Sequence, residues 1–113
     1  MQPLHRKAFD DEIGHVRDAL AQRDHERAYR HLERAHILGQ RYVRPHTHTH
    51  LLFLLIGWRR RDWREILGQL ARIPLGMLGS ALNRVPVGNT GGANVSMFQA
   101  MPIPDDLRER LEP

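Results

Sequence analysis

The stretch HLERAHILGQRYVRPHTHTHLLFLLIGW, residues 31–58, joins the end of one expected helix to the whole of the next. Pro45 suits the first turn of a helix, where its missing backbone N–H costs nothing. The run from His46 to Trp58 is apolar nearly all round after residue 50. A helix of that kind lies in the middle of a bundle. The stretch therefore predicts a central helix that begins with three histidines alternating with threonine.

Two amphipathic helices are expected before this central one. Residues 5–22 repeat apolar side chains at alternating steps of four and three, as the buried stripe of a helix does: Phe9, Ile13, Val16 and Leu20. Asp24 is a suitable N-cap for a second helix running to about Gln40. The stripe of that helix contains small residues that permit close helix packing: Ala28, Leu32, Ala35 and Gly39. The short link between the two helices predicts that they are antiparallel.

A fourth helix is expected after the central one. Asp62 and Glu65 have the spacing of a capping box at its start, and its apolar residues are Ile66, Leu67, Leu70 and Ile73. Pro74 is expected to kink or end this helix, because proline removes a hydrogen bond and crowds the preceding turn. A further helical piece is expected over residues 75–83.

The tail from residue 86 mixes proline and glycine with large apolar side chains. Disordered tails seldom hold so many of these, so we expect an ordered, extended tail that packs on the third or fourth helix through Val87, Val95, Phe98, Met101 and Ile103. The loop GNTGG, residues 88–92, lacks the lysine–serine/threonine ending of a phosphate-binding loop and is interpreted as a tight turn. The expected fold is all-α: a bundle of about four helices in residues 1–85 with a packed tail in residues 86–113.

Composition excludes several classes of site. The chain has 113 residues, enough for one domain, and no cysteine, so disulfides, thiolate metal sites and cysteine nucleophiles are excluded. The N-terminus is charged throughout and resembles no signal peptide, and no apolar run is long enough to span a membrane. We therefore expect a cytoplasmic protein. The net charge of +4 rests on arginines interleaved with acids, a pattern that argues against nucleic-acid binding.

Histidines gather in and just before the central helix. Five of the eight lie between residues 31 and 50, and none follows. His46 and His50 are four residues apart, so on a helix they share a face and can reach one metal ion. In an extended strand, His46, His48 and His50 would share a face instead. Imidazoles beside an apolar run need polar partners, and a single metal ion satisfies several of them together.

Carboxylates extend the candidate ligand set. Glu33 and His36, like Glu12 and His15, have the Glu-x-x-His spacing found in di-iron carboxylate bundles. The set is richer in imidazole than that pattern, which favours zinc, cobalt, nickel or copper over magnesium or calcium. The expected ligands, between the second and third helices, are His36, His46 and His50, with Glu33, His15 or water completing the shell. The alternative for each residue is ordinary: a buried histidine with local partners, or a solvated glutamate paired with arginine.

Three segments, RAHILGQRYVRPHTHTH, GWRRRDWREILGQLARI and VPVGNTGGANVSMFQAMPIPDDL, resemble an uncharacterised bacterial family, domain-of-unknown-function family 3703. The resemblance covers nearly the whole chain. It includes Arg34, Ala35, His36, His46, His50 and the loop from Gly88 to Ser96. Members are encoded near heavy-metal efflux and metal-responsive regulator genes, so the resemblance implies divalent-metal handling and heavy-metal resistance. It assigns no role to any single residue.

These patterns predict a transition-metal-binding protein that binds, buffers or delivers a divalent ion, zinc ahead of cobalt, nickel, copper or iron. No nucleophile lies beside a base and no substrate pocket is evident, which favours binding over catalysis. The alternative is a helical-hairpin protein-interaction module without metal, because ERAYRHLERAHILGQ resembles the second helix of a tetratricopeptide-type hairpin. Expected partners are the metal ion, a metal-handling protein and, through the apolar third helix, a second copy of the chain.

Overall fold

The helices begin and end close to where local signals place them. The computed structural model describes residues 1–111. The helices are α1 (Pro3–Ala21), α2 (His25–Gly39), α3 (Val43–Arg60), α4 (Trp63–Ala81) and the short α5 (Asp105–Arg108). Pro45 lies in the first turn of α3, as expected. The prediction of an all-α bundle of about four helices is confirmed.

Two aspartates cap helices through their side chains. Asp24 accepts a hydrogen bond from the backbone N–H of Arg27 at 3.1 Å, and Asp62 accepts one from the N–H of Glu65 at 3.1 Å. The second half of the expected capping box is wrong, however. The backbone N–H of Asp62 donates to the carbonyl of Gly57 at 2.8 Å, and the Glu65 carboxylate is bound elsewhere. The capping signal therefore located the start of the helix correctly. The Glu65 side chain, however, makes its hydrogen bonds elsewhere in the protein and not with Asp62.

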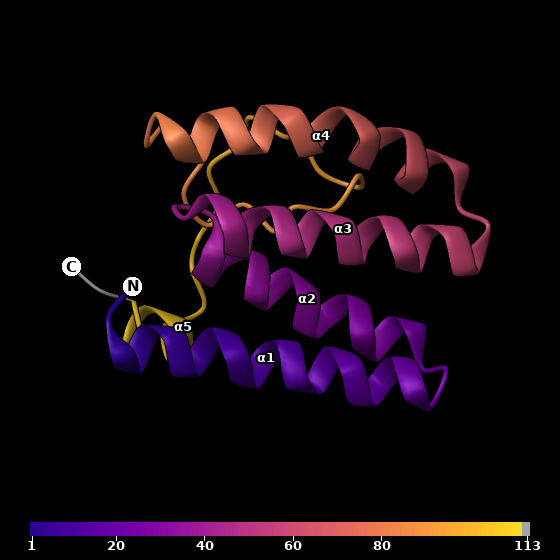
Figure 1. The fold of residues 1–113 in the computed structure, drawn as a ribbon, viewed down its shortest axis with the longest axis horizontal. Coiled ribbons are helices and arrows are strands. Elements are labelled where there is room, and N and C mark those ends of the chain that lie inside the picture. Colours follow the sequence, from indigo (N-terminus) through magenta and orange to yellow (C-terminus); the bar gives the residue numbers. More distant parts are fainter. Residues whose placement is uncertain (112–113) are drawn as a thin grey trace.

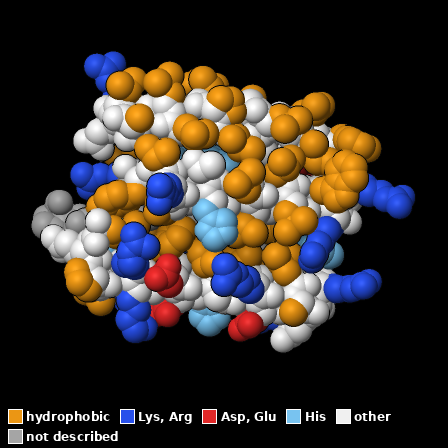
Figure 2. Space-filling model, viewed as in Figure 1, with side chains coloured by type: hydrophobic (Ala, Val, Ile, Leu, Met, Phe, Trp, Pro, Cys, Tyr) orange, Lys and Arg blue, Asp and Glu red, His pale blue; other side chains and the backbone are white. Residues whose placement is uncertain are grey.

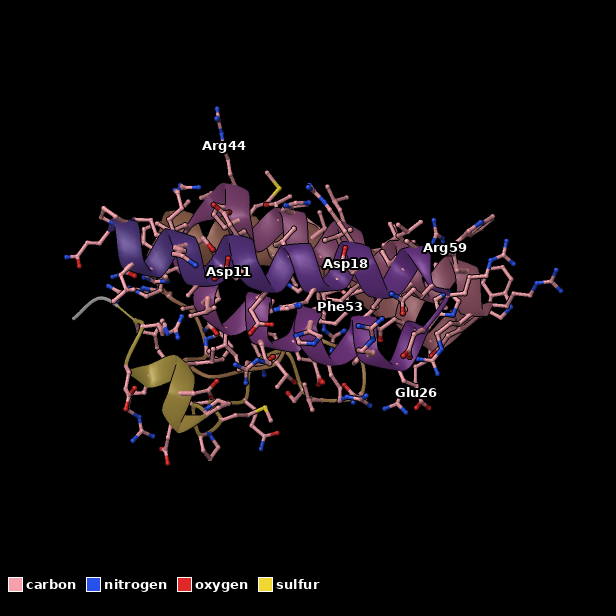
Figure 3. All side chains as sticks on the ribbon, turned by 90° about the horizontal axis from the view of Figure 1, so that it is seen from below. Asp11, Asp18, Glu26, Arg44, Phe53 and Arg59 are labelled. Carbon is pink, nitrogen blue, oxygen red and sulfur yellow. The ribbon has the colours of Figure 1, made fainter. Side chains whose placement is uncertain are left out.

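The four long helices pack in chain order, with α1 on α2, α2 on α3 and α3 on α4 (Figure 1). The predicted central position of the third helix is confirmed, because α3 lies between α2 and α4. The predicted stripes of the first two helices are buried: Phe9, Ile13, Val16, Leu20, Ala28, Leu32 and Ala35. Phe53 of α3 is fully buried among the ribbons, whereas Arg44 and Arg59 at the two ends of that helix point away from the body (Figure 3).

Pro74 does not end the fourth helix, so the expectation of an end at this proline, with a separate helical piece from residue 75, is wrong. α4 continues through Pro74 to Ala81 as one helix (Figure 1). Proline cannot donate to the carbonyl four residues earlier, but it removes only that one bond. Pro74 is exposed, and α4 contacts α3 on both sides of it, through Gln69 to His50 and through Ser80 to His46. Packing along the whole helix therefore overrides the local signal.

The segment after α4 returns over the helices and ends in α5 (Figure 1), where Asp106 pairs with Arg34 of α2. Leu107 is buried in the core, and Ile103 and Leu111 pack against it. The expectation that every large apolar residue of this segment is covered is wrong for two of them, since Val87 is 53% and Phe98 81% exposed. The sequence also gave no sign of α5, which is only four residues long.

Large apolar side chains remain exposed along α4, and hydrophobic atoms gather over this helix in the space-filling view (Figure 2). Those exposed by more than half include Trp63, Leu67, Leu70 and Leu78. None of the helices in residues 1–111 combines the length and apolar character needed to cross a membrane.

Candidate metal centre

Three buried imidazoles from two helices converge at one point. α2 supplies His36 from its last turn, and α3 supplies His46 and His50 from successive turns. The Nε2 atom of His46 lies 2.9 Å from that of His36 and 2.9 Å from that of His50, and the third pair is 3.2 Å apart. Each residue is at most 5% exposed. Within residues 1–111, these three form the only group of three or more potential ligands close enough to hold an ion.

The hydrogen bonds of His50 fix which ring nitrogen carries its proton. Its Nδ1 lies 2.6 Å from Oε1 of Gln69. The Gln69 amide nitrogen donates to Glu65 at 3.2 Å and to the carbonyl of Gly91 at 2.9 Å, so its oxygen must face the imidazole. An amide oxygen only accepts. The proton of His50 is therefore on Nδ1, and its Nε2 presents a lone pair.

The same reasoning applies to the other two rings. His46 Nδ1 lies 2.6 Å from the hydroxyl of Ser80, and that hydroxyl donates its own hydrogen to the carbonyl of Gln40 at 2.6 Å. The hydroxyl oxygen must therefore accept from His46. His36 Nδ1 lies 2.7 Å from the carbonyl oxygen of Asn89, which can only accept. Both rings are protonated on Nδ1 and present a lone pair from Nε2.

Three lone pairs thus face one another, with no proton between them to form a hydrogen bond. This arrangement is repulsive in a neutral, empty cluster and favourable around a cation. Metal-bound histidines almost always donate the second ring N–H to a carbonyl, carboxylate or water, which fixes the tautomer. A tetrahedral ion with metal–nitrogen distances near 2.0–2.1 Å places its ligands about 3.3 Å apart. The observed separations of 2.9–3.2 Å need only a small expansion to reach that value.

Burial keeps these imidazoles neutral. It lowers the pKa of His36 well below its ordinary value, and the adjacent His50 and His46 lower it further. Burial, and then the charge of His50, lowers the pKa of His46 to about 3. Burial lowers the pKa of His50 to about 4, against the opposing effect of the hydrogen bond that its Nδ1–H donates to Gln69. All three are therefore neutral at neutral pH, with one ring proton each, the state that a metal requires.

Close backbone approaches at two glycines pack other segments against the rings. A Cβ at Gly76 of α4 would lie 3.0 Å from Cε1 of His46. A Cβ at Gly91 would overlap the ring of His36, and Gly91 also has a positive φ of 88°. The loop interpreted as a tight turn is therefore the segment that supports two of the three imidazoles. It supplies the Asn89 carbonyl to His36 and the Gly91 carbonyl to Gln69.

The structure does not bring Glu33 or His15 into this group. His15 is exposed on α1, and its ring stacks on His31 with centroids 4.7 Å apart. Glu33 is half-buried, and burial raises the pKa of its carboxyl. Glu12, the partner of His15 in the Glu-x-x-His spacing, binds His31 at 2.7 Å and Arg34 at 2.8 Å. Of the four residues that match the di-iron spacing, only His36 therefore lies in the cluster.

Sequence reasoning missed the residues that orient the ligands. Gln69, Gly76 and Ser80 lie on α4 at steps of seven and four, so they share the face that meets α3. A polar, a glycine and a hydroxyl residue at these positions interrupt what would otherwise be an apolar stripe. This interruption is the sequence feature that could have indicated residues supporting the ligands on this helix.

Of the three comparisons with known proteins, only the scan of family models gives a match. No curated protein and no solved structure matches it. A family model matches residues 4–111, nearly the whole chain and all three histidines of the cluster. The chain therefore belongs to the family of proteins of unknown function DUF3703.

Proposed function

We propose that this protein binds one divalent transition-metal ion between α2 and α3 through the Nε2 atoms of His36, His46 and His50. The observation that carries the proposal is the convergence of three lone pairs whose tautomers are each set by an outer hydrogen bond. Three neutral nitrogen ligands suit zinc, cobalt, nickel, copper and iron(II) better than magnesium or calcium, which take oxygen ligands. Zinc is the ion that we expect first, since three histidines are an established zinc ligand set.

The role that fits is the binding, buffering or delivery of a divalent metal. The ligands come from two helices of the core and their supports come from α4 and the tail, so ion binding links segments that are distant in sequence. An ion bound there stabilises the folded state relative to the unfolded chain. We propose that metal handling, rather than catalysis, is the task of this family member.

Metal analysis of protein purified without a histidine tag tests the proposal directly. We expect close to one zinc or cobalt ion per chain by elemental analysis after loading and desalting, with saturation at one equivalent in calorimetry. The melting temperature should rise on loading, because the ion binds only the folded state. Less than a tenth of an equivalent, with no change in melting temperature, would falsify the proposal.

The alternative role, a protein-interaction module without metal, is favoured by one observation. The outer face of α4 exposes Trp63, Leu67, Leu70 and Leu78 by more than half. Exposed apolar patches of this kind mark interaction surfaces. If elemental analysis finds no bound metal, this second role is favoured. The imidazole cluster is then a polar element of the core.

Acid is expected to destabilise the metal-free protein between about pH 6.5 and pH 4. The pKa values of His36, His46 and His50 are lowered in the fold, to about 3 for His46 and about 4 for His50, whereas in the unfolded chain they are near 6.5. Below pH 6.5 the unfolded chain binds protons that the native state does not, so the free energy of unfolding falls as pH falls. This stabilising contribution is fully present above about pH 6.5.

Urea unfolding of the metal-free protein at several pH values checks this expectation. Glu33 works in the opposite direction, because its raised pKa favours the folded state as pH falls. Three histidines outweigh this one carboxyl, so we expect a net loss. Simultaneous replacement of His46 and His50 should flatten the pH dependence in this window. A free energy of unfolding that is constant from pH 7 to pH 5 contradicts the lowered pKa values.

A further inference from the structure

A cavity of about 100 Å³ borders the three imidazoles. The histidines form one wall, and the others include Gly76 and Gly79 of α4 and the tail residues Met97 and Phe98. One water takes about 30 Å³ of liquid volume, so the cavity has room for roughly three. A tetrahedral ion held by three histidines keeps its fourth position for another ligand. That ligand has space for only a few heavy atoms.

The charge of this cavity is positive. Arg72 and Arg84 line it, and none of its lining residues in the described chain is an aspartate or glutamate. Three neutral imidazoles leave the full charge of a divalent ion uncompensated. Arg72 lines the same cavity as His36 and His50, so its charge acts on a ligand of the ion.

Two buried polar atoms of the cavity's lining residues lack a partner within residues 1–111. Arg72 donates from Nη1 to Gly68 at 3.1 Å and from Nη2 to Val95 at 2.8 Å, while its Nε–H has no acceptor. Gln40 is 2% exposed and donates from Nε2 to Pro86 at 3.0 Å, while its Oε1 has no donor. Buried polar atoms are nearly always paired in native proteins. Both atoms have almost no accessible surface, so the contribution of Arg72 to be tested is the charge of its guanidinium and not a direct hydrogen bond.

The geometry points to a small oxyanion, of the size of bicarbonate or acetate, as an exchangeable fourth ligand of the bound ion. This inference rests on the proposed metal site. Arg72 and Arg84, which line the cavity, offset the charge of the anion. The centre is then a coordinatively open site selective for small monoanions, and not a closed structural site.

Cobalt(II)-loaded protein provides the test, because the visible d–d absorption of cobalt responds to its fourth ligand. Bicarbonate, acetate and thiocyanate should each change this spectrum saturably in the wild-type protein. Benzoate, which has too many heavy atoms for a cavity of about 100 Å³, should not. If cobalt binds one per chain but no small anion alters its spectrum, the open-site inference is overturned and the metal proposal stands. If cobalt does not bind at all, both fail.

Variants of Arg72 separate its electrostatic role from a structural one. Arg72→Met should weaken anion binding at least tenfold and leave cobalt binding equal or tighter, since a repelling charge is lost. Arg72→Lys, which keeps the charge, should restore most of the anion affinity. Arg59→Met, at the exposed end of α3, is the matched control and should change neither affinity. A purely structural role would weaken cobalt and anion binding together, and that outcome overturns the assignment. If Arg72→Met does not fold, the inference is tested by Arg72→Lys and by comparing the small anions with benzoate in the wild-type protein.

Discussion

Replacing His46 and His50 together by alanine is expected to abolish stoichiometric binding of zinc or cobalt. The change leaves His36 as the only imidazole of the cluster, and one buried imidazole cannot hold a divalent ion against water. Loss of a hydrogen-bond partner of a ligand already costs roughly 10–100-fold in metal affinity, so loss of two ligands should exceed that range. Calorimetric titration with zinc measures the effect. The isotherm of the double variant should show no saturable phase at one equivalent.

The matched control is His48→Ala, which removes an imidazole from the same helix between the two ligands. His48 is half-buried and lies outside the cluster, so its loss should leave zinc affinity within about threefold. His5→Ala is unsuitable as a control. His5 is 1% exposed and its Nε2 lies 2.5 Å from the carbonyl of Leu38, so its loss would disturb the α1–α2 interface. Unchanged zinc affinity in a folded double variant would remove His46 and His50 from the ligand set.

The fold was predictable where it depends on local periodicity. The apolar repeats of α1 and α2, the cap at Asp24 and the all-round apolar run of α3 each need only a few neighbouring residues to be interpreted, and each prediction held. The prediction that Pro74 could end the helix was wrong because it weighed one lost hydrogen bond and ignored the packing of α4 on α3. Tertiary contacts routinely override a local preference of that size. The prediction that Phe98 is covered was also wrong, because an apolar side chain need not be covered to belong to an ordered segment.

Of the candidate site, only the three clustered histidines could be predicted from the sequence. The four-residue spacing brought His46 and His50 together, and the inward face of α2 added His36. The atoms that orient them come from residues 19–53 positions away in sequence. One of these is the backbone carbonyl of Asn89, which any residue could supply. Helical spacing can therefore nominate ligands, but the tautomers that turn them toward an ion depend on tertiary structure.

Truncation after Arg84 is expected to remove most of the stability of the bundle, with or without metal. We propose that the tail is a part of the folding unit. It contributes Leu107 to the core and packs Ile103 and Leu111 against it. Burial of one such side chain stabilises by about 1.5–3 kcal/mol, against a net stability of roughly 5–15 kcal/mol for a domain. The melting temperature should fall by at least about 15 °C, or the cooperative transition should vanish. A soluble truncated protein with an unchanged melting temperature would show instead that the tail is independent of the bundle.

Gly91→Ala tests the tail at a single position, without loss of the apolar contacts. An alanine there must adopt a positive φ of 88°, and its Cβ meets the ring of His36. The loop or the imidazole must shift, so zinc affinity should fall about tenfold or more, and stability should fall by about 1–3 kcal/mol. Gly14→Ala is the matched control, because a Cβ at Gly14 of α1 meets nothing within 4 Å. Alanine at that helical position should stabilise by about 0.5–1 kcal/mol and leave zinc binding unchanged. Equal effects of the two substitutions on zinc affinity would mean that the loop does not support His36.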